Sequence, residues 1–207
     1  MCSHKELRHD RDELKARIID VAFAAFTREG IKAVRMDDLS ATLGISKRTL
    51  YEVFSDKEEL LLECIKHHHI QSRQELFAYA SQETDIVKIL WTFFLKKVTD
   101  LENMNPRYFV ELLRYEKIRE FQQQCRENDR EATMKFYQKG ISQGFFRQDV
   151  NFDIYHSLMS VMADGFVHTT VEIPYSMAEI LKVFISVNLR GICTDKGLHQ
   201  LKELAGE

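Results

Sequence analysis

Apolar residues recur at helical spacing along most of this chain, and that spacing limits the fold more than any other feature of the sequence. Near the N-terminus, one apolar stripe runs through Leu14, Ile18, Val21, Ala22, Ala25 and Phe26. No stretch is typical of a β-strand, and only two prolines and eight glycines interrupt the 207 residues. The sequence therefore predicts an all-α protein.

Capping residues and helix breakers mark the ends of the predicted helices. Expected capping boxes pair Asp10 with Glu13, Ser55 with Glu58, and Ser176 with Glu179. Single caps are expected at Ser46, Thr84 and Asn105, and glycine stops at Gly30 and Gly44. The predicted helices cover about 10–30, 36–43, 46–54, 56–69, 117–142, 152–172 and 176–194, and two more begin near 84 and 105.

Composition excludes several classes of protein. The four cysteines are far apart and form no CxxC pair, so neither a disulfide framework nor a metal site is expected, and no cofactor is implied. The net charge of -3 disfavours sequence-blind binding to polyanions, although a local basic patch can still bind DNA. No segment is apolar enough to span a bilayer, and the first residues contain no apolar signal region. A cytoplasmic protein without a membrane partner is expected.

The segment Met36–Phe54 carries the clearest functional pattern. It predicts two short helices that meet at a turn containing Gly44, which is the pattern of a helix-turn-helix. At about 100° per residue, one side of the second helix holds Leu50, Val53 and Phe54. The other side holds Lys47, Arg48, Tyr51 and Glu52. Such cations, hydroxyls and rings meet phosphates and base edges in a major groove, so the segment predicts DNA binding. The alternative is an ordinary surface helix with two basic residues.

The run Gly30–Leu61 resembles the DNA-binding domain of TetR-type (TetR/AcrR) regulators. In that family a first helix ends in Gly, and a Gly-Val/Ile-Ser turn precedes the reader helix, which is the helix that contacts the DNA. The next helix begins with acidic residues. The matching residues are Gly30, Asp38, Leu39, Gly44, Ile45, Ser46, Leu50, Tyr51, Phe54, Lys57, Glu58, Glu59 and Leu60. Spacing and residue types agree together over about fifty residues. The later pieces GFFRQD and LRGICTDKG resemble the family only in outline.

The resemblance implies roles for the matching positions. The family contacts DNA, mostly at phosphates, where this chain has Ser46, Lys47, Thr49 and Tyr51. Arg48 falls where the family reads bases, and Lys57 falls where a helix start grips a phosphate. Arg35 replaces a Thr that usually caps the second helix. Because Arg can contact a phosphate but cannot cap, that helix start departs from the family. Glu52 either accepts from a cytosine amino group or repels other sequences.

The resemblance also implies an effector site in a larger C-terminal helical domain. Aromatic residues and methionines are abundant there, and they suit a mainly apolar ligand. The candidate lining residues are Trp91, Tyr115, Tyr137, Met159, Met162 and His168.

Two helices near the C-terminus are apolar over a wide arc. Such helices need burial on two sides, and a second copy of the chain would supply the second side. The candidate dimer residues are Ile154, Leu158, Val161, Ile180, Phe184 and Val187. The alternative is a monomer that buries both helices within one core.

Two further motifs have weaker functional interpretations. The segment Gly140–Gly144 spells G-x-S-x-G, which would place a hydrolase nucleophile at Ser142. That chemistry needs a strand before the serine, whereas the preceding residues are helical in character. The three histidines 67–69 cannot all ligate one ion, because neighbouring helix residues point about 100° apart. Neither an enzyme nor a metal site is expected.

These observations predict a helix-turn-helix DNA-binding domain over 1–55 and a helical effector-binding and dimerisation domain over 56–207. The helix at about 56–69 would join them. The expected function is a dimeric repressor that a small, mainly apolar ligand releases from its DNA operator. The alternatives are a helical protein-interaction module without DNA affinity, and a hydrolase that uses Ser142.

Overall fold

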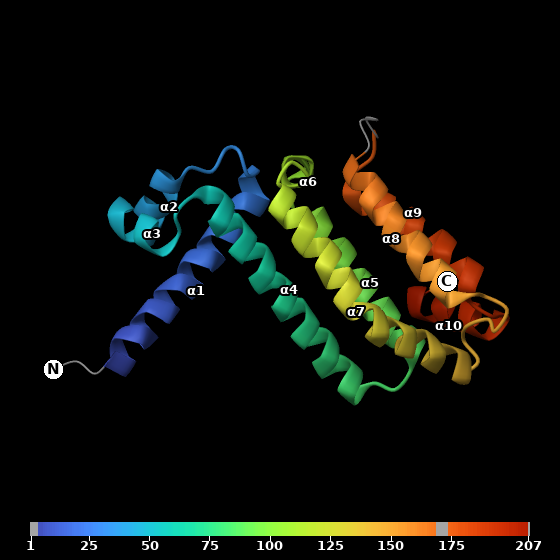
Figure 1. The fold of residues 1–207 in the computed structure, drawn as a ribbon. Helices are drawn as coiled ribbons and strands as arrows, with labels where there is room; N and C mark the ends of the chain where they lie inside the picture. Colours follow the sequence, from blue (N-terminus) through green and yellow to red (C-terminus); the bar gives the residue numbers. More distant parts are fainter. Residues whose placement is uncertain (1–3, 169–173, 207) are drawn as a thin grey trace. The chain divides into compact units, whose positions relative to one another are not determined.

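The computed structural model describes residues 4–168 and 174–206 of the chain. Within that part, ten α-helices form and no β-strand does (Figure 1). They are α1 (His4–Glu29), α2 (Met36–Leu43), α3 (Lys47–Val53), α4 (Lys57–Gln82), α5 (Ile86–Glu102), α6 (Pro106–Leu112), α7 (Glu116–Ser142), α8 (Phe152–His168), α9 (Met177–Ile192) and α10 (Asp195–Ala205). The predicted all-α fold is confirmed.

The chain divides into two compact units. The first contains Met1–Arg73 and Met104–Ile118, and the second contains Gln74–Asn103 and Arg119–Glu207. Both units therefore combine segments that are distant in the sequence. The functional boundary expected at residues 55 and 56 stays a prediction.

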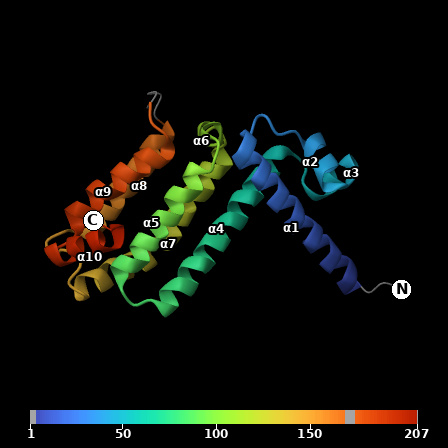
Figure 2. The same cartoon turned by 180° about the vertical axis from the view of Figure 1, so that it is seen from behind.

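The apolar stripe of α1 forms the centre of the first unit. Ile18 and Phe26 are inaccessible to solvent and pack in one cluster with Leu50 of α3 and Leu61 of α4. The first turns of α4 lie beside the C-terminal half of α1 in both views (Figures 1 and 2). Burying one such side chain contributes about 1.5–3 kcal/mol, so α1 holds α3 and α4 in place mainly by apolar contact.

The short helix α6 closes the C-terminal end of α1. Asn105 accepts a hydrogen bond from the backbone of Arg107, as expected of its cap position. Its own backbone N–H donates to the carbonyl of Thr27 at 2.7 Å, and its side-chain amide donates to that of Arg28. Glu111 accepts from the backbone N–H of Lys32 at 2.7 Å. These bonds satisfy backbone groups that a helix end leaves unpaired.

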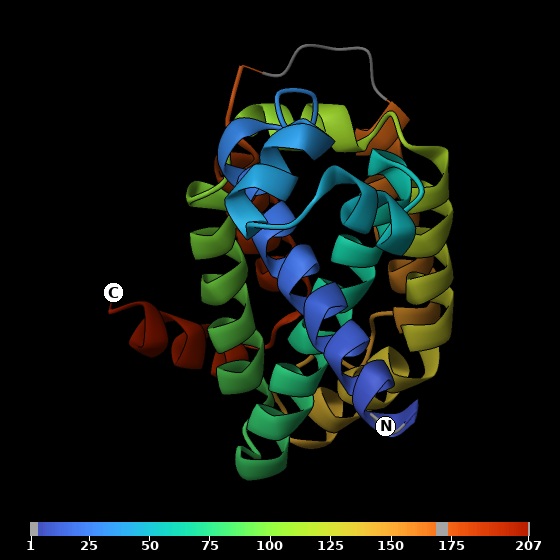
Figure 3. The same cartoon turned by 90° about the vertical axis from the view of Figure 1, so that its left-hand side faces the viewer.

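The second unit is built from two helical layers and a short closing helix. Within it, α5 and α7 form one layer and α8 and α9 the other, and α10 packs against α5 (Figure 3). Aromatic rings fill the end of α7, where Tyr137 stacks on Phe152 at 4.6 Å between ring centroids. Gly140 lets Phe146 approach closely, because a Cβ at that position would lie 2.1 Å from the Phe146 ring.

Several predicted helix starts are wrong. α1 begins at His4 and not at Asp10, because residues 4–9 contain no breaker that would delay the helix. The cap of α5 is Asp85, which accepts from two backbone N–H groups, and not Thr84. At α4, Asp56 accepts from the backbone of Glu59, whose carboxylate in turn accepts from Ser55. The expected pairing of Ser55 with Glu58 is therefore shifted by one residue.

Two helix ends were also predicted wrongly. α4 continues to Gln82 and does not end at His69, since no glycine or proline occurs between 57 and 82. The helix predicted over 176–194 corresponds to α9, which ends at Ile192, whereas α10 after the cap at Thr194 was not predicted. The capping box of Ser176 and Glu179 is confirmed.

Candidate nucleic-acid interface

The turn between α2 and α3 has the geometry that a helix-turn-helix requires. Gly44 adopts the left-handed conformation with a φ of 68°, which most side chains disfavour, and it ends α2. Ser46 then caps α3 by accepting a hydrogen bond from the backbone of Thr49 at 3.0 Å. The stop predicted at Gly44 and the cap predicted at Ser46 are confirmed.

The helix α3 has one buried and one open face. Leu50 is inaccessible, and Phe54 at its C-cap is buried in the same cluster. On the open face, the side chain of Arg48 is 88% exposed and that of Lys47 is 64% exposed. Tyr51 is also exposed, and α3 lies at the outside of the first unit in Figure 2. Two cations and a phenol are therefore accessible to a partner, on a helix anchored by the buried Leu50.

Both cations on this face have acidic neighbours. The guanidinium of Arg48 donates to Glu52 at 2.8 Å, and this hydrogen bond and charge raise the pKa of Arg48. The ammonium of Lys47 donates to Asp37 at 2.5 Å. Ion pairs between exposed side chains are weak, so a phosphate or a base edge can compete with these carboxylates. The sequence analysis identified Glu52 but not Asp37, because Asp37 reaches the reader helix only through the folded turn.

Lys57 occupies a different kind of site. Its ammonium donates to the carbonyls of Ile31 at 3.0 Å and Val34 at 3.1 Å. Partial burial lowers the pKa of Lys57, and the charge of Glu111 opposes that shift. Lys57 thus ties the turn between α1 and α2 to the start of α4. The phosphate contact expected of Lys57 stays a prediction.

Arg35 stands just before α2 and makes no side-chain cap hydrogen bond. Its carbonyl accepts from the backbone of Asp38 and Leu39. The negative charges of Asp37 and Asp38 in the first turn stabilise α2 by interacting with the positive end of the helix dipole. They therefore offset the missing cap. The Arg35 side chain is exposed beside the reader.

Of the candidate ligand residues whose side chains are described, Trp91 alone lines the pocket between α5, α9 and α10. Tyr115 packs against the core of the first unit, and Tyr137 packs in the aromatic core of the second. Met159 is half-buried and Met162 exposed on α8. The side chain of His168 lies outside the described residues.

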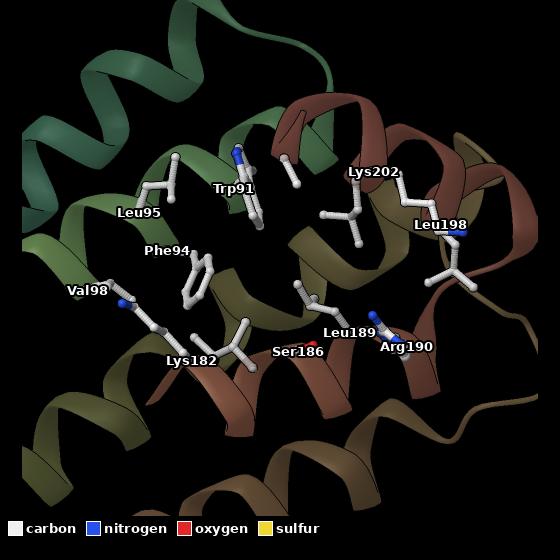
Figure 4. Close-up of a pocket in the computed structure, with 13 residues that line it drawn as sticks. Trp91, Phe94, Leu95, Val98, Lys182, Ser186, Leu189, Arg190, Leu198 and Lys202 are labelled. Carbon is white, nitrogen blue, oxygen red and sulfur yellow. The ribbon is translucent and has the colours of Figure 1, made fainter. Parts of the chain in front are cut away.

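The pocket that Trp91 lines has a volume of about 360 Å³ (Figure 4). Its other lining residues are Phe94, Leu95, Val98, Lys182, Ile185, Ser186, Leu189, Arg190, Leu198, Leu201, Lys202 and Ala205. Sequence reasoning missed them because it did not predict α10 and could not show which faces of α5 and α9 this helix meets. The Thr194 cap and the spacing of Leu198, Leu201 and Ala205 were the available signals.

The candidate dimer residues lie on α8 and α9. Ile154, Leu158, Val161 and Val187 are exposed, whereas Ile180 and Phe184 are half-buried. Val183, which the sequence analysis did not name, is 65% exposed. Large apolar side chains that one chain leaves in water are typical of a surface with a partner.

The two weaker motifs have structural explanations. The hydroxyl of Ser142 donates to the carbonyl of Lys139 at 2.8 Å, at the end of α7, with no strand before it. The ring of His68 stacks on Phe23 at 3.4 Å between centroids, and His67 lies 3.9 Å from Asp20. In the described part of the chain, no cluster of His, Cys, Asp or Glu could hold a metal ion. No described helix is both long and apolar enough to cross a membrane.

A capped helix α3 that follows a glycine turn and packs against α1 has the architecture of a helix-turn-helix. Residues 18–64 match the family described as bacterial regulatory proteins, tetR family. Residues 18–64 therefore form a DNA-binding domain of the TetR type. The resemblance found in the sequence is confirmed.

Individual relatives share parts of the chain. The transcriptional activator FasR of Mycolicibacterium smegmatis is 36% identical over 61 residues, which are 30% of this chain and 28% of that protein. The negative regulator IcaR of the icaADBC biofilm operon in Staphylococcus aureus is 23% identical over 99 residues, 48% of this chain and 53% of IcaR. The chain thus matches about half or less of the length of these two proteins.

A solved structure extends the likeness of the fold to nearly the whole chain. The structure of the gamma-butyrolactone receptor, an ArpA-like protein, aligns with this one at a TM-score of 0.60. The alignment covers 95% of this chain and 96% of the receptor chain. Its sequence is 16% identical, so the likeness concerns the fold alone.

Proposed function

We propose that this protein is a sequence-specific repressor that works as a dimer and leaves its operator when a small ligand binds. The observation that carries the proposal is the open face of α3, where Lys47, Arg48 and Tyr51 project from a helix anchored by the buried Leu50. Such a face suits a DNA major groove. A DNA operator also implies that the protein works in the cytoplasm.

Within this proposal, Arg48 reads bases and its neighbours position the helix on phosphates. The positioning contacts are assigned to Arg35, Ser46, Lys47, Thr49, Tyr51 and Lys57. Arg48 projects from the side of α3 opposite Leu50, so it reaches farthest into a groove. The phosphate contacts set the orientation but carry no direct sequence information.

The experiment selects bound sequences from random DNA and then measures gel shifts at two salt concentrations. Arg48→Ala should lose the base preference and weaken specific binding about tenfold or more per half-site. Arg130→Ala is the matched control, because Arg130 is also exposed and paired with a carboxylate, that of Asp153. If Arg48→Ala keeps the same preferred sequence, another residue reads the bases. If the unaltered protein shows no selection at all, the chain is an interaction module without DNA specificity.

The dimer is proposed from the exposed apolar side chains of α8 and α9. Leu158, Val161, Val183 and Val187 are each more than half exposed in the single chain. A two-fold contact would cover them and place two reader helices about 34–36 Å apart. Sedimentation should find a dimer for the native chain and a 24.4 kDa species for Leu158→Asp. A native chain that sediments at 24.4 kDa would contradict the dimer.

We propose that the protein lowers transcription from its operator and does not raise it. IcaR is named a negative regulator and FasR an activator, so both signs occur among the relatives. A protein bound in a DNA groove excludes other proteins from that groove. Repression by exclusion therefore needs no further contact surface. Transcription in vitro from a promoter that contains the selected operator should fall when the protein is added. A rise would make the protein an activator.

Release by a ligand is proposed because the second unit offers a pocket of about 360 Å³ and α4 runs from the reader domain into that unit. A ligand can shift the equilibrium only by its differential affinity for the two states, typically about 1–3 kcal/mol. Operator DNA must then weaken ligand binding by the same factor. Calorimetric titration with and without operator tests this reciprocity. Equal affinities for every ligand that binds would favour constitutive DNA binding.

A further inference from the structure

The pocket between α5, α9 and α10 combines an apolar interior with cations. Trp91, Phe94, Leu189 and Leu201 contribute most of its apolar lining. None of its thirteen lining residues is acidic, whereas three are cationic: Lys182, Arg190 and Lys202. An apolar site with positive charge and no carboxylate favours a ligand that is both apolar and anionic.

The three cations are not equivalent. Lys182 donates to Glu102 at 2.6 Å, so its charge is already balanced. No carboxylate among the described residues lies within ion-pair distance of Arg190 or Lys202. Figure 4 shows Arg190 and Lys202 toward one end of the pocket and Lys182 toward the other, with Trp91 and Leu189 between them. The uncompensated charge is therefore concentrated at one end.

The volume of the pocket and the positive charge at one end determine the size and charge of a ligand that fits. A volume of 360 Å³ holds about a dozen non-hydrogen groups if each takes the roughly 30 Å³ of a water molecule. We propose that the pocket binds a monocarboxylate with an unbranched or aromatic apolar body of about ten carbons. The carboxylate lies between Arg190 and Lys202, and the apolar body lies along Trp91 and Leu189.

The apolar part of the pocket is separate from the surface assigned to the dimer. On α9, the lining residues Lys182, Ile185 and Leu189 follow one another at helical spacing and share one face. The exposed Val183 and Val187 lie about 100° or more around the helix from that face. Arg190 lies at the edge of the pocket nearest to Val183 and Val187, so a second copy that covers these valines borders on Arg190 and leaves the apolar lining uncovered.

The inference rests on the proposed function only in identifying this pocket as the effector site. Binding of a carboxylate can be measured without DNA, and base selection can be measured without a ligand. A failure of either measurement is therefore distinguishable from a failure of the other.

Decanoate is the probe, because it has the required length and charge. Trp91 is the only tryptophan of the chain, so its fluorescence reports this pocket alone. Decanoate below its micellar concentration should give a saturable change in that fluorescence. Decanol, with the same chain and no charge, should bind about tenfold more weakly, and acetate should not bind. Added salt should reduce the difference between decanoate and decanol, because it screens exposed charges.

The double variant Arg190→Gln, Lys202→Gln tests the assigned carboxylate contact. It should bind decanoate and decanol about equally, while its affinity for decanol stays that of the native protein. Lys97→Gln is the matched control, since Lys97 is exposed on α5 but does not line the pocket. All substituted residues are exposed, so helix content by circular dichroism should not change.

Four results would overturn the proposal. The first is native protein that binds decanol as tightly as decanoate. The second is a double variant that keeps the preference for decanoate. The third is calorimetric binding of decanoate without a change in Trp91 fluorescence. The fourth is no binding of decanoate by either method. Loss of the preference in the double variant alone, with Lys97→Gln unchanged, supports the assigned site.

Discussion

The two units bury their apolar residues to different degrees. In the first unit, Ile18, Phe26 and Leu50 are inaccessible to solvent and belong to one continuous core. Among the described side chains of the second unit, large residues such as Trp91 and Phe94 are only half-buried, and Val183 is exposed. A closely packed interior has few alternative arrangements, whereas partly covered helices can accept a partner. The comparison predicts that the first unit is rigid and that the second unit can rearrange when it binds a partner.

Removing one aromatic side chain from each unit tests this contrast most strongly. Phe26→Ala should lower the free energy of unfolding by about 3–5 kcal/mol, because the surrounding core cannot collapse into the cavity. Phe94→Ala should lower it by about 1 kcal/mol, since solvent already reaches that ring. Urea unfolding followed by circular dichroism measures both values. Similar losses for the two variants would show that the units are packed equally well.

The aromatic end of α7 is the exception within the second unit, and Gly140 tests how tightly it is packed. Gly140→Ala should cost about 1–3 kcal/mol, because its Cβ would lie 2.1 Å from a ring atom of Phe146. Gly191→Ala is the matched control, since no atom lies within 4 Å of its added Cβ and alanine favours the helix. Thermal unfolding should separate the two variants. If Gly140→Ala is as stable as the native chain, the Phe146 ring moves at little cost.

The helix starts of the two units allow a smaller comparison. Ser176 is itself the cap of α9 in the second unit, whereas Asp56 takes that role at α4 and Ser55 only contacts Glu59. Ser176→Ala and Asp56→Ala should each cost about 1 kcal/mol, and Ser55→Ala should cost less. Urea unfolding measures the three values. A larger loss for Ser55→Ala than for Asp56→Ala would restore the pairing expected from the sequence.

The smallest expected effect concerns the charges on the reader. Glu52→Gln removes the carboxylate that binds Arg48, so DNA affinity should rise by about two- to fivefold, most clearly at low salt. Glu131→Gln is the matched control, because it breaks the same kind of pair with Lys135 in the second unit. Its DNA affinity should stay unchanged. If Glu52→Gln weakens operator binding, Glu52 contacts a base and does not merely compete for Arg48.

Local sequence was sufficient for the features that depend on a few neighbouring residues. The caps at Ser46 and Ser176 and the stop at Gly44 each form between groups at most four residues apart. The apolar stripe around Ile18 likewise follows from helical spacing. These features were enough to predict an all-α fold and the face of α3 that carries Arg48.

Only the tertiary structure determined the contacts between distant segments. Lys57 binds the carbonyls of Ile31 and Val34, whereas the family resemblance implies a phosphate contact there. The pocket joins Trp91 of α5 to Arg190 of α9 and Lys202 of α10, about a hundred residues apart in the sequence. Helical periodicity indicates which side chains share a face, but it does not indicate which helix that face meets. The orientation of α3 could therefore be predicted from the sequence, whereas the pocket became visible only when the three helices packed together.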